Sequence, residues 1–261
     1  MTTAVARLFS RAAATSGGGR EPQDKVACRL IEMAPANDGA IRSILEVGCG
    51  TGLLTEKALA RYPAARLTAI DVACGMVQQV NATFTAGGRV RALAADARTF
   101  ASDEPYDLIL SSSALHWSIP LDATFENLRK LLKGKGTLVA SIMLEGTLGE
   151  LHRLRRTLVP DCVPSGRLPG RSEVEAALAA AGFAIRAIEE ETIRVRYASA
   201  QDFLRSIHEQ GVTGGAVSHG PRPLCRGELR RLAAAYDREF RNGDGSVYSS
   251  YAVLYLTATA V

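Results

Sequence analysis

The sequence predicts a doubly wound α/β protein with a mostly parallel sheet, and three observations support this fold. Short apolar runs alternate with helical patterns between residues 43 and 143, which is the rhythm of βαβ units. A glycine-rich turn joins the first of these runs to the next helical pattern, and acidic residues close later runs. Because the carboxyl ends of parallel strands meet at one crevice, we expect a ligand site at those ends.

The elements of the first half follow in a regular order. An amphipathic helix comes first, with Val26, Leu30 and Ile31 on one side. The expected strands share a short apolar run that closes at a turn: 43–48, 65–71, 89–96, 106–113 and 136–143. The helical patterns before and between them lie at 23–33, 53–62, 75–84 and 121–132, the last stopped by Gly134. We therefore expect an N-terminal cap at 1–33 and a cofactor-binding core at 40–145.

After residue 145 the pattern becomes less regular. Residues 183–197 alternate like a strand and 249–261 are rich in β-branched and aromatic residues, so the sheet is expected to have seven strands. A helix at 172–181 ends at Gly182, a C-cap signal. The remaining segments, 146–170 and 199–243, are expected to be helical insertions that act as a lid on one domain spanning 1–261.

Composition limits the class of protein. The 261 residues are 47% hydrophobic and 22% charged, which is typical of a globular domain that buries a sizeable core. The net charge of +4 is too small to indicate a nucleic-acid partner. Five cysteines without C-x-x-C spacing predict neither a disulfide framework nor a zinc site, and no metal is expected. No segment is long and apolar enough for a bilayer, so the sequence favours a cytoplasmic enzyme without a membrane partner. It gives no oligomeric state.

The strongest motif is I-L-E-V-G-C-G-T-G at 44–52, where a strand is expected to turn into a helix. Gly48 and Gly50 allow the backbone to approach a ligand, and the helix start offers unpaired N–H groups. The G-x-G-x-G spacing differs from the G-x-G-x-x-G of dinucleotide sites. Glu46, two residues before Gly48, suits a ligand with a cationic amino-acid end. The alternative is a tight turn without a ligand.

Further candidates follow the later strands. Asp71 closes the second strand and suits ribose hydroxyls, although an aspartate there also suits a helix N-cap. Asp96 closes the third strand, so three acids stand at three successive strand ends. S-S-S-A-L-H-W at 111–117 follows the fourth strand and contains His116, for which a structural role and a role beside the substrate both stay open. Trp117 is favoured as a packing anchor.

The 44–52 motif resembles motif I of the class I methyltransferases, whose fold is Rossmann-like. This resemblance implies S-adenosyl-L-methionine as cofactor, with S-adenosyl-L-homocysteine as its product. It also implies that Asp96 faces the adenine amine and that the loop from Ser111 lies beside the transferred methyl. The cofactor-binding residues expected on this basis are Gln23, Glu46, Gly48, Cys49, Gly50, Asp71, Val72, Met76, Asp96, Ala97 and Ser111.

The rest of the chain resembles the malonyl-acyl carrier protein methyltransferases of biotin synthesis. The stretches that carry the resemblance are F-S-R-A-A-A (9–14), Y-D-L-I-L-S-S-S-A-L-H-W (106–117), M-L-E-G-T-L-G-E-L-H (143–152) and F-L-R-S-I-H-E-Q-G-V-T-G (203–214). The chain departs from this family at Ser16 and the three glycines after it, where a tyrosine is usual. Ala73 replaces a hydroxyl cap, and His116 stands where glutamine is more common.

This resemblance implies an enzyme that methylates the free carboxylate of malonyl-acyl carrier protein, which starts the synthesis of the pimeloyl precursor of biotin. A carboxylate is already ionised at pH 7, so no essential base is expected. The candidates for positioning the substrate are His116 and Arg205. Arg226 and Arg230 fall at helical spacing and are the candidates for docking the acidic carrier. Two alternatives stay open: a methyltransferase for a small free acid, like the trans-aconitate enzymes, and an inactive cofactor-binding regulator.

Overall fold

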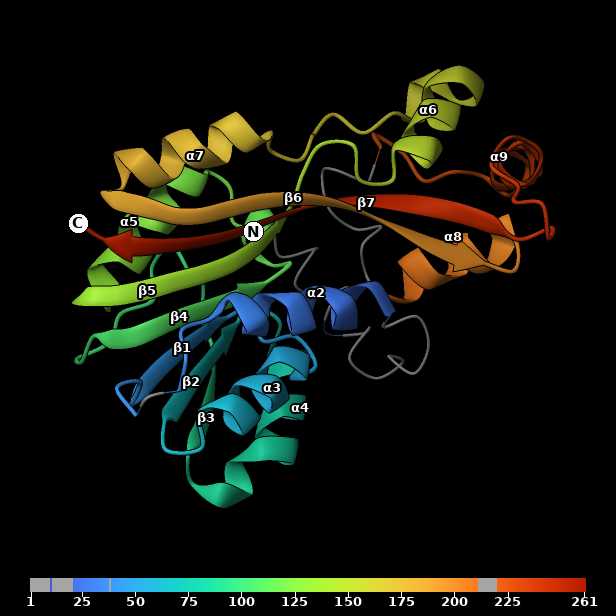
Figure 1. Cartoon of the computed structure of the whole chain (residues 1–261). Helices are drawn as coiled ribbons and strands as arrows, with labels where there is room; N and C mark the ends of the chain where they lie inside the picture. Colours follow the sequence, from blue (N-terminus) through green and yellow to red (C-terminus); the bar gives the residue numbers. More distant parts are fainter. Residues whose placement is uncertain (1–9, 11–20, 38, 211–219) are drawn as a thin grey trace.

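The computed structural model describes residues 10, 21–37, 39–210 and 220–261. Within these residues seven strands form one sheet, in the order β3-β2-β1-β4-β5-β7-β6 (Figure 1). The strands are β1 (Ser43–Val47), β2 (Arg66–Asp71), β3 (Val90–Ala94), β4 (Tyr106–Ser112), β5 (Leu132–Met143), β6 (Phe183–Tyr197) and β7 (Val247–Ala260). Residues 9, 11–19 and 211–214, which belong to stretches that carried the family resemblance or its departures, lie outside the described part.

The sheet is parallel from β3 to β5 and antiparallel at β7. β1 pairs in parallel with both β2 and β4, so the chain winds outward from β1 in two directions. β7 runs antiparallel to β5 and to β6. This topology confirms the predicted doubly wound, mostly parallel fold. The order of strands reverses between β1 and β4, and ligands bind sheets of this kind at such a switch point.

Alternate residues of each core strand pack against different helices. In β1, Ile44 is buried with the helices of one face, whereas Leu45 is buried with those of the other. The first face carries α2 (Glu21–Met33), α3 (Leu53–Arg61) and α4 (Cys74–Phe84), and the second carries α5 (Leu121–Leu131) and α7 (Arg171–Ala180) (Figure 1). Because successive side chains of a strand point to opposite faces, buried residues on both faces produce two separate apolar layers, one on each side of the sheet.

A third apolar cluster lies around the long ends of β6 and β7. β7 pairs with β5 only over 253–259 but with β6 over 247–260, so the two strands extend beyond the sheet as a ribbon. Around this ribbon gather α6 (Gly149–Leu158), α8 (Ala200–Glu209) and α9 (Arg226–Glu239) (Figure 1). Leu151, Phe203 and Tyr236 from these helices pack with Tyr251 of the ribbon. All three helices come from the segments expected to be insertions.

Some boundaries differ from expectation. The helix expected to run to 132 ends at Leu131, and β5 begins at Leu132 rather than at Gly136. The reason is that Leu132 pairs with Tyr106 of β4 before a shift in register. The C-cap at Gly182 is confirmed, because this residue follows α7 with a φ of +79°. In the described part of the chain, every helix is too short or too polar to cross a membrane.

Candidate functional site

A cavity of about 300 Å³ opens at the carboxyl ends of β1 to β4. The turns after β1, β2 and β3 line one end of it, including Glu46, Asp71 and Asp96, and the loop after β4 adds His116. The other end is lined by residues from the insertions and the ribbon: Thr147, Leu148, His152, Leu168, Glu209, Gln210 and Tyr251. The three acids predicted to converge therefore do line one cavity, and residues of α6, the end of α8 and the ribbon line its far end.

The glycine turn is required by close packing as well as by the cavity. Gly48 has a φ of +74°, and a Cβ there would lie 2.2 Å from the Cβ of Ala114. Any side chain would push away the loop that carries His116. Gly52 has a φ of +89°, and a Cβ there would lie 2.4 Å from the Phe84 ring at the end of α4. The group that packs closely against Gly52 is thus the Phe84 ring, rather than the preceding strand.

Glu46 is a buried carboxyl with one oxygen engaged. Thr55 Oγ1 of α3 donates a hydrogen bond to Glu46 Oε2 at 2.6 Å, whereas Oε1 has no partner in the described structure. Burial raises the pKa of Glu46 to about 8. A buried polar atom without a partner is costly, and such atoms commonly mark a ligand or functional site. Oε1 is therefore suited to a donor that arrives with a ligand.

Asp71 joins the turn after β2 to the glycine turn after β1 by hydrogen bonds. Its Oδ2 accepts from Gly50 N–H at 3.0 Å and its Oδ1 from Ala73 N–H at 2.9 Å. Burial raises the pKa of Asp71, and these two hydrogen bonds oppose that effect. A carboxylate has about four acceptor positions, so the same oxygens are suited to ribose hydroxyls as well. Ala73 offers no side-chain cap to α4, and Ser10 Oγ instead accepts from Gly75 N–H at 3.3 Å.

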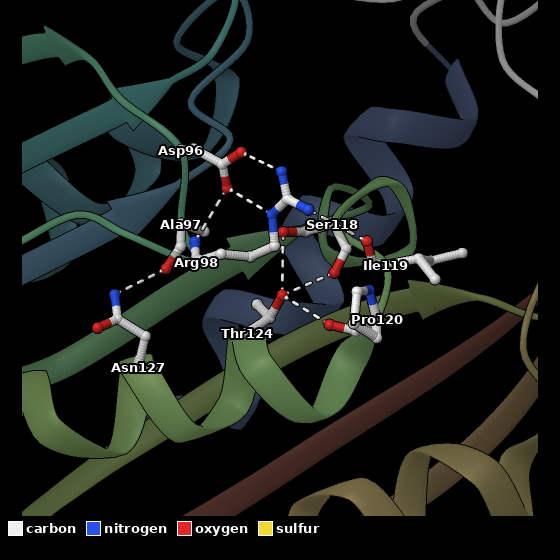
Figure 2. Close-up of polar contacts among 8 residues, drawn as sticks. All are labelled: Asp96, Ala97, Arg98, Ser118, Ile119, Pro120, Thr124 and Asn127. Atoms are coloured by element: carbon white, nitrogen blue, oxygen red, sulfur yellow. Dashed lines mark hydrogen bonds and ion pairs between the residues drawn. The ribbon is translucent and has the colours of Figure 1, made fainter. Parts of the chain in front are cut away.

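Asp96 is held by its neighbour Arg98 (Figure 2). Arg98 Nη2 donates to Asp96 Oδ2 at 2.6 Å and Arg98 Nε donates to Oδ1 at 3.0 Å. This two-point contact lowers the pKa of Asp96 to about 2. The carboxyl is therefore ionised at any working pH and can only accept hydrogen bonds, which suits the amine that the resemblance places there.

Two histidines line the other part of the cavity. His116 is buried, and its Nδ1 accepts from the N–H of Met143 at 3.4 Å. Burial lowers the pKa of His116 to about 3, so the ring is neutral and its proton is on Nε2. His152 comes from α6; burial, and then Arg155 and Arg156, lower its pKa as well. Both rings therefore act as neutral groups at pH 7.

A hydrogen bond in the lining of the cavity joins α2 to the end of α8. Gln23 Nε2 donates to Gln210 Oε1 at 2.8 Å, and both residues line the cavity. Gln23 Oε1 is buried without a hydrogen-bond partner in the described structure. The predicted cap and one of the predicted insertions thus meet over the site, through residues that are 187 positions apart.

Of the other residues predicted to bind the cofactor, all but Ser111 line the cavity. Cys49, Val72, Met76 and Ala97 line the cavity, as do Gly48 and Gly50. Ser111 does not: its hydroxyl donates to Val47 O at 2.8 Å and joins β4 to β1, while Ser112 and Ser113 line the cavity.

The arginines proposed for substrate and carrier lie away from the cavity. Arg205 on α8 is outside the lining, with its guanidinium 3.1 Å from Asp202. Arg226 and Arg230 are exposed on α9. The roles predicted for these three arginines stay predictions.

The comparisons with known proteins agree with this geometry. A family model described as "Methyltransferase domain" matches residues 44–136, which span β1 to the start of β5. A malonyl-acyl carrier protein O-methyltransferase from Paenibacillus sp. (strain JDR-2) is 30% identical, covering 94% of each chain. The chain belongs to the malonyl-acyl carrier protein O-methyltransferase family. A member of this family from Geobacter sulfurreducens is 29% identical, covering 96% of each chain.

Solved structures of other proteins share the fold. The YcgJ protein from Bacillus subtilis has a TM-score of 0.65 at 16% identity and covers 90% of this chain and 98% of its own. Geranyl diphosphate methyltransferase, solved in complex with SAM, has a TM-score of 0.57 at 14% identity, with 96% and 94% covered. At these identities the likeness concerns the fold alone.

The residues of this family member fit S-adenosylmethionine. The Glu46 oxygen without a partner suits the cationic amino-acid end, Asp71 suits the ribose, and Asp96 suits the adenine amine. Met76 and Val72 add apolar surface to the same part of the lining. We missed several lining residues in the sequence, among them Thr147, His152 and Tyr251. His152 lies in the E-L-H stretch that carried the family resemblance, so that stretch was the available signal.

Proposed function

We propose that this chain transfers a methyl group from S-adenosylmethionine to the free carboxylate of a malonyl thioester on an acyl carrier protein. The names of its relatives over nearly the full chain support the substrate. The observation that carries the proposal is a single cavity with two chemically different ends. One end has an acid at each of three strand ends, and the other has mainly neutral polar and apolar groups from the insertions and the ribbon, with Glu209 as the one acid among the described residues there.

The chemistry needs alignment rather than acid–base catalysis. The bound cofactor supplies a methyl group on a positively charged sulfur; the substrate oxygen forms a bond to this carbon while the carbon–sulfur electron pair stays on sulfur. The malonyl carboxylate is ionised at pH 7 and gives up no proton. The residues of this chain therefore bind the two reactants, orient them and exclude water.

The neutral state of His116 suits this charge-cancelling reaction. A carboxylate and a sulfonium become a neutral ester and a neutral thioether, so strong stabilisation of the carboxylate would oppose the transfer. His116 carries its proton on Nε2 because Nδ1 accepts from Met143. We infer that Nε2–H orients the carboxylate with one neutral hydrogen bond, and that His152 contributes to the same end of the cavity. Arg205 stays a candidate for capturing the carboxylate at the entrance.

The insertions are proposed as the lid and as the carrier-binding face. Arg153 of α6 pairs with Glu239 of α9 at 2.9 Å, which fixes the two helices to one another. Arg226 and Arg230 are exposed on this unit, and we propose that they bind the acidic surface of the carrier. Contacts of this kind act mainly on the rate of association and weaken with salt.

The direct test is incubation with S-adenosylmethionine and malonyl-acyl carrier protein, followed by intact mass measurement of the carrier. We expect the gain of one methyl group, and its loss after mild ester hydrolysis. A carrier that stays unmodified while a small free dicarboxylic acid is methylated would contradict the proposed substrate.

The docking proposal has a separate test. We expect kcat/KM for malonyl-carrier to fall steeply from low to high salt, while kcat/KM for a small malonyl thioester changes little. Arg226→Glu with Arg230→Glu should reduce only the value for the carrier. Arg186→Glu with Arg91→Glu, at exposed positions of β6 and β3, is the control with the same change in net charge. Equal salt dependence for both substrates would exclude α9 from the docking face.

A further inference from the structure

Arg98 holds the carboxylate of Asp96 through three hydrogen bonds. Its Nε and Nη2 donate to the two different oxygens of this carboxylate, and its backbone N–H donates to Oδ1 at 3.0 Å (Figure 2). Asp96 lines the cavity, whereas Arg98 is not among the lining residues. The guanidinium therefore acts on a ligand in the cavity through the carboxylate.

Both partners of this pair are fixed by other elements (Figure 2). Arg98 Nη1 donates to Ile119 O at 3.4 Å, on the loop that follows β4. The turn that carries Asp96 is fixed from α5, because Asn127 Nδ2 donates to both Ala97 O and Phe100 O at 2.9 Å. A two-point contact between two anchored groups leaves the carboxylate one orientation.

We propose that Arg98 is a positioning residue that aims the Asp96 carboxylate at the 6-amino group of the cofactor's adenine. This inference rests on the proposed function. A 6-amino group donates to a carboxylate, whereas the 6-oxo group of an inosine analogue presents an acceptor to it and is repelled. Arg98 therefore makes the site select the 6-amino nucleoside. The lowered pKa of Asp96 supports this role, because a protonated carboxyl could accept from a 6-amino group but could equally donate to a 6-oxo group.

The test compares two nucleosides that differ at position 6 and, because the 6-oxo form carries a proton on N1, at N1 as well. The N1 difference is the same for every variant, so a change in preference between variants reports on Asp96. The dissociation constants of S-adenosylhomocysteine and S-inosylhomocysteine are measured by calorimetry for the wild-type protein and for variants. We expect the wild-type protein to prefer the 6-amino nucleoside by roughly 10- to 100-fold, the range for a hydrogen bond to a charged group. Arg98→Ala should reduce this preference to about threefold or less, mainly by weakening S-adenosylhomocysteine.

Two further variants separate positioning from folding. Arg98→Lys keeps the charge but loses the two-point contact, so we expect a preference between those of the wild-type protein and Arg98→Ala. Arg91→Ala removes an exposed arginine from β3, the strand that leads to Asp96, and should leave the preference unchanged. A purely structural role for Arg98 would weaken both nucleosides equally and keep their ratio.

The outcomes that would contradict the inference, the placement of Asp96 or the cofactor can be told apart by the binding of the two nucleosides. A wild-type preference that persists in both Arg98→Ala and Arg98→Lys would refute the role of Arg98 while leaving the proposed function intact. Equal binding of both nucleosides by the wild-type protein would overturn the placement of Asp96 at the adenine, and with it this inference. Binding of neither nucleoside would overturn the proposed cofactor itself.

Discussion

Binding of the cofactor should release a proton from Glu46, and replacement of Glu46 by glutamine should abolish this release. In the structure Glu46 is buried, its pKa is about 8, and its Oε1 has no partner. The carboxyl is therefore mostly protonated at pH 7. A cationic ammonium group placed against Oε1 favours the ionised form and lowers this pKa again. Binding of S-adenosylmethionine should thus expel the proton.

The magnitude follows from the pKa. At pH 7 a group with a pKa near 8 is about 90% protonated, and a bound-state pKa below about 5 leaves almost none. We therefore expect a release of about 0.9 proton per cofactor bound. Below pH 8 the affinity should rise with pH by up to about tenfold per unit, because the cofactor binds the ionised form.

The assay is titration calorimetry at pH 7 in two buffers that differ in their enthalpy of ionisation. The slope of the apparent enthalpy against the buffer enthalpy gives the number of protons released. In Glu46→Gln, which resembles the protonated carboxyl, the slope should fall to near zero. Glu56→Gln, at an exposed carboxylate of α3, should behave as the wild-type protein.

The same group makes a prediction for the stability of the protein without cofactor. The folded pKa of Glu46 lies above the unfolded value of 4.5. Its contribution to the free energy of unfolding is therefore fully present below pH 4.5 and is lost as the pH rises through about 8. Glu46→Gln should remove this loss, which amounts to roughly 1 kcal/mol per pH unit. In the calorimetric assay, wild-type binding without proton release, or equal proton release by Glu46→Gln, would refute the reasoning.

Three further predictions test the rest of the site. Asp71→Ala should raise the Kd for S-adenosylhomocysteine roughly 30- to 150-fold, because hydrogen bonds from the ribose hydroxyls to a charged carboxylate are lost; unchanged tight binding in calorimetry would contradict the assignment. Gly48→Ala should lower the free energy of unfolding by about 2–3 kcal/mol in urea titrations, since its Cβ would meet Ala114; Gly87→Ala, where a Cβ meets open space, should change it by less than about 1 kcal/mol. His116→Gln should keep kcat within about tenfold, because a neutral N–H donor is retained; a loss of several orders of magnitude with unchanged KM would indicate an essential base.

The topology of the core could be predicted from the sequence because its signals are local. Apolar runs of strand length, each followed by a turn and a helical pattern, indicate parallel pairing through short-range rules alone. The glycine turn at 48–52 and the acids Glu46, Asp71 and Asp96 follow from the same pattern, because strand ends in a parallel sheet meet at one edge. The predicted boundary between α5 and β5 was wrong, because the true boundary depends on the pairing of Leu132 with Tyr106 in another strand.

The end of the cavity that we propose for the substrate could not be predicted in this way. His152, Tyr251 and Gln210 reach it from α6, β7 and the end of α8. Their meeting depends on how far the β6–β7 ribbon extends beyond β5, which is a property of the assembled sheet. Arg205 was chosen for the substrate from its motif alone, and only its place on α8 showed that Asp202 is its neighbour.

The sequence by itself therefore determined the fold, the family and the set of acids at the cofactor end, since periodicity and motif spacing are properties of the local chain. Only the tertiary structure decided the chemical state of those acids. Glu46 is buried and mostly protonated, whereas Asp96 is paired with Arg98 and ionised. Two carboxyl side chains at the ends of neighbouring parts of the sheet thus acquire different charge states, one mostly neutral and one ionised. The reason is that a pKa depends on burial and on the exact geometry of nearby charges, which packing alone sets.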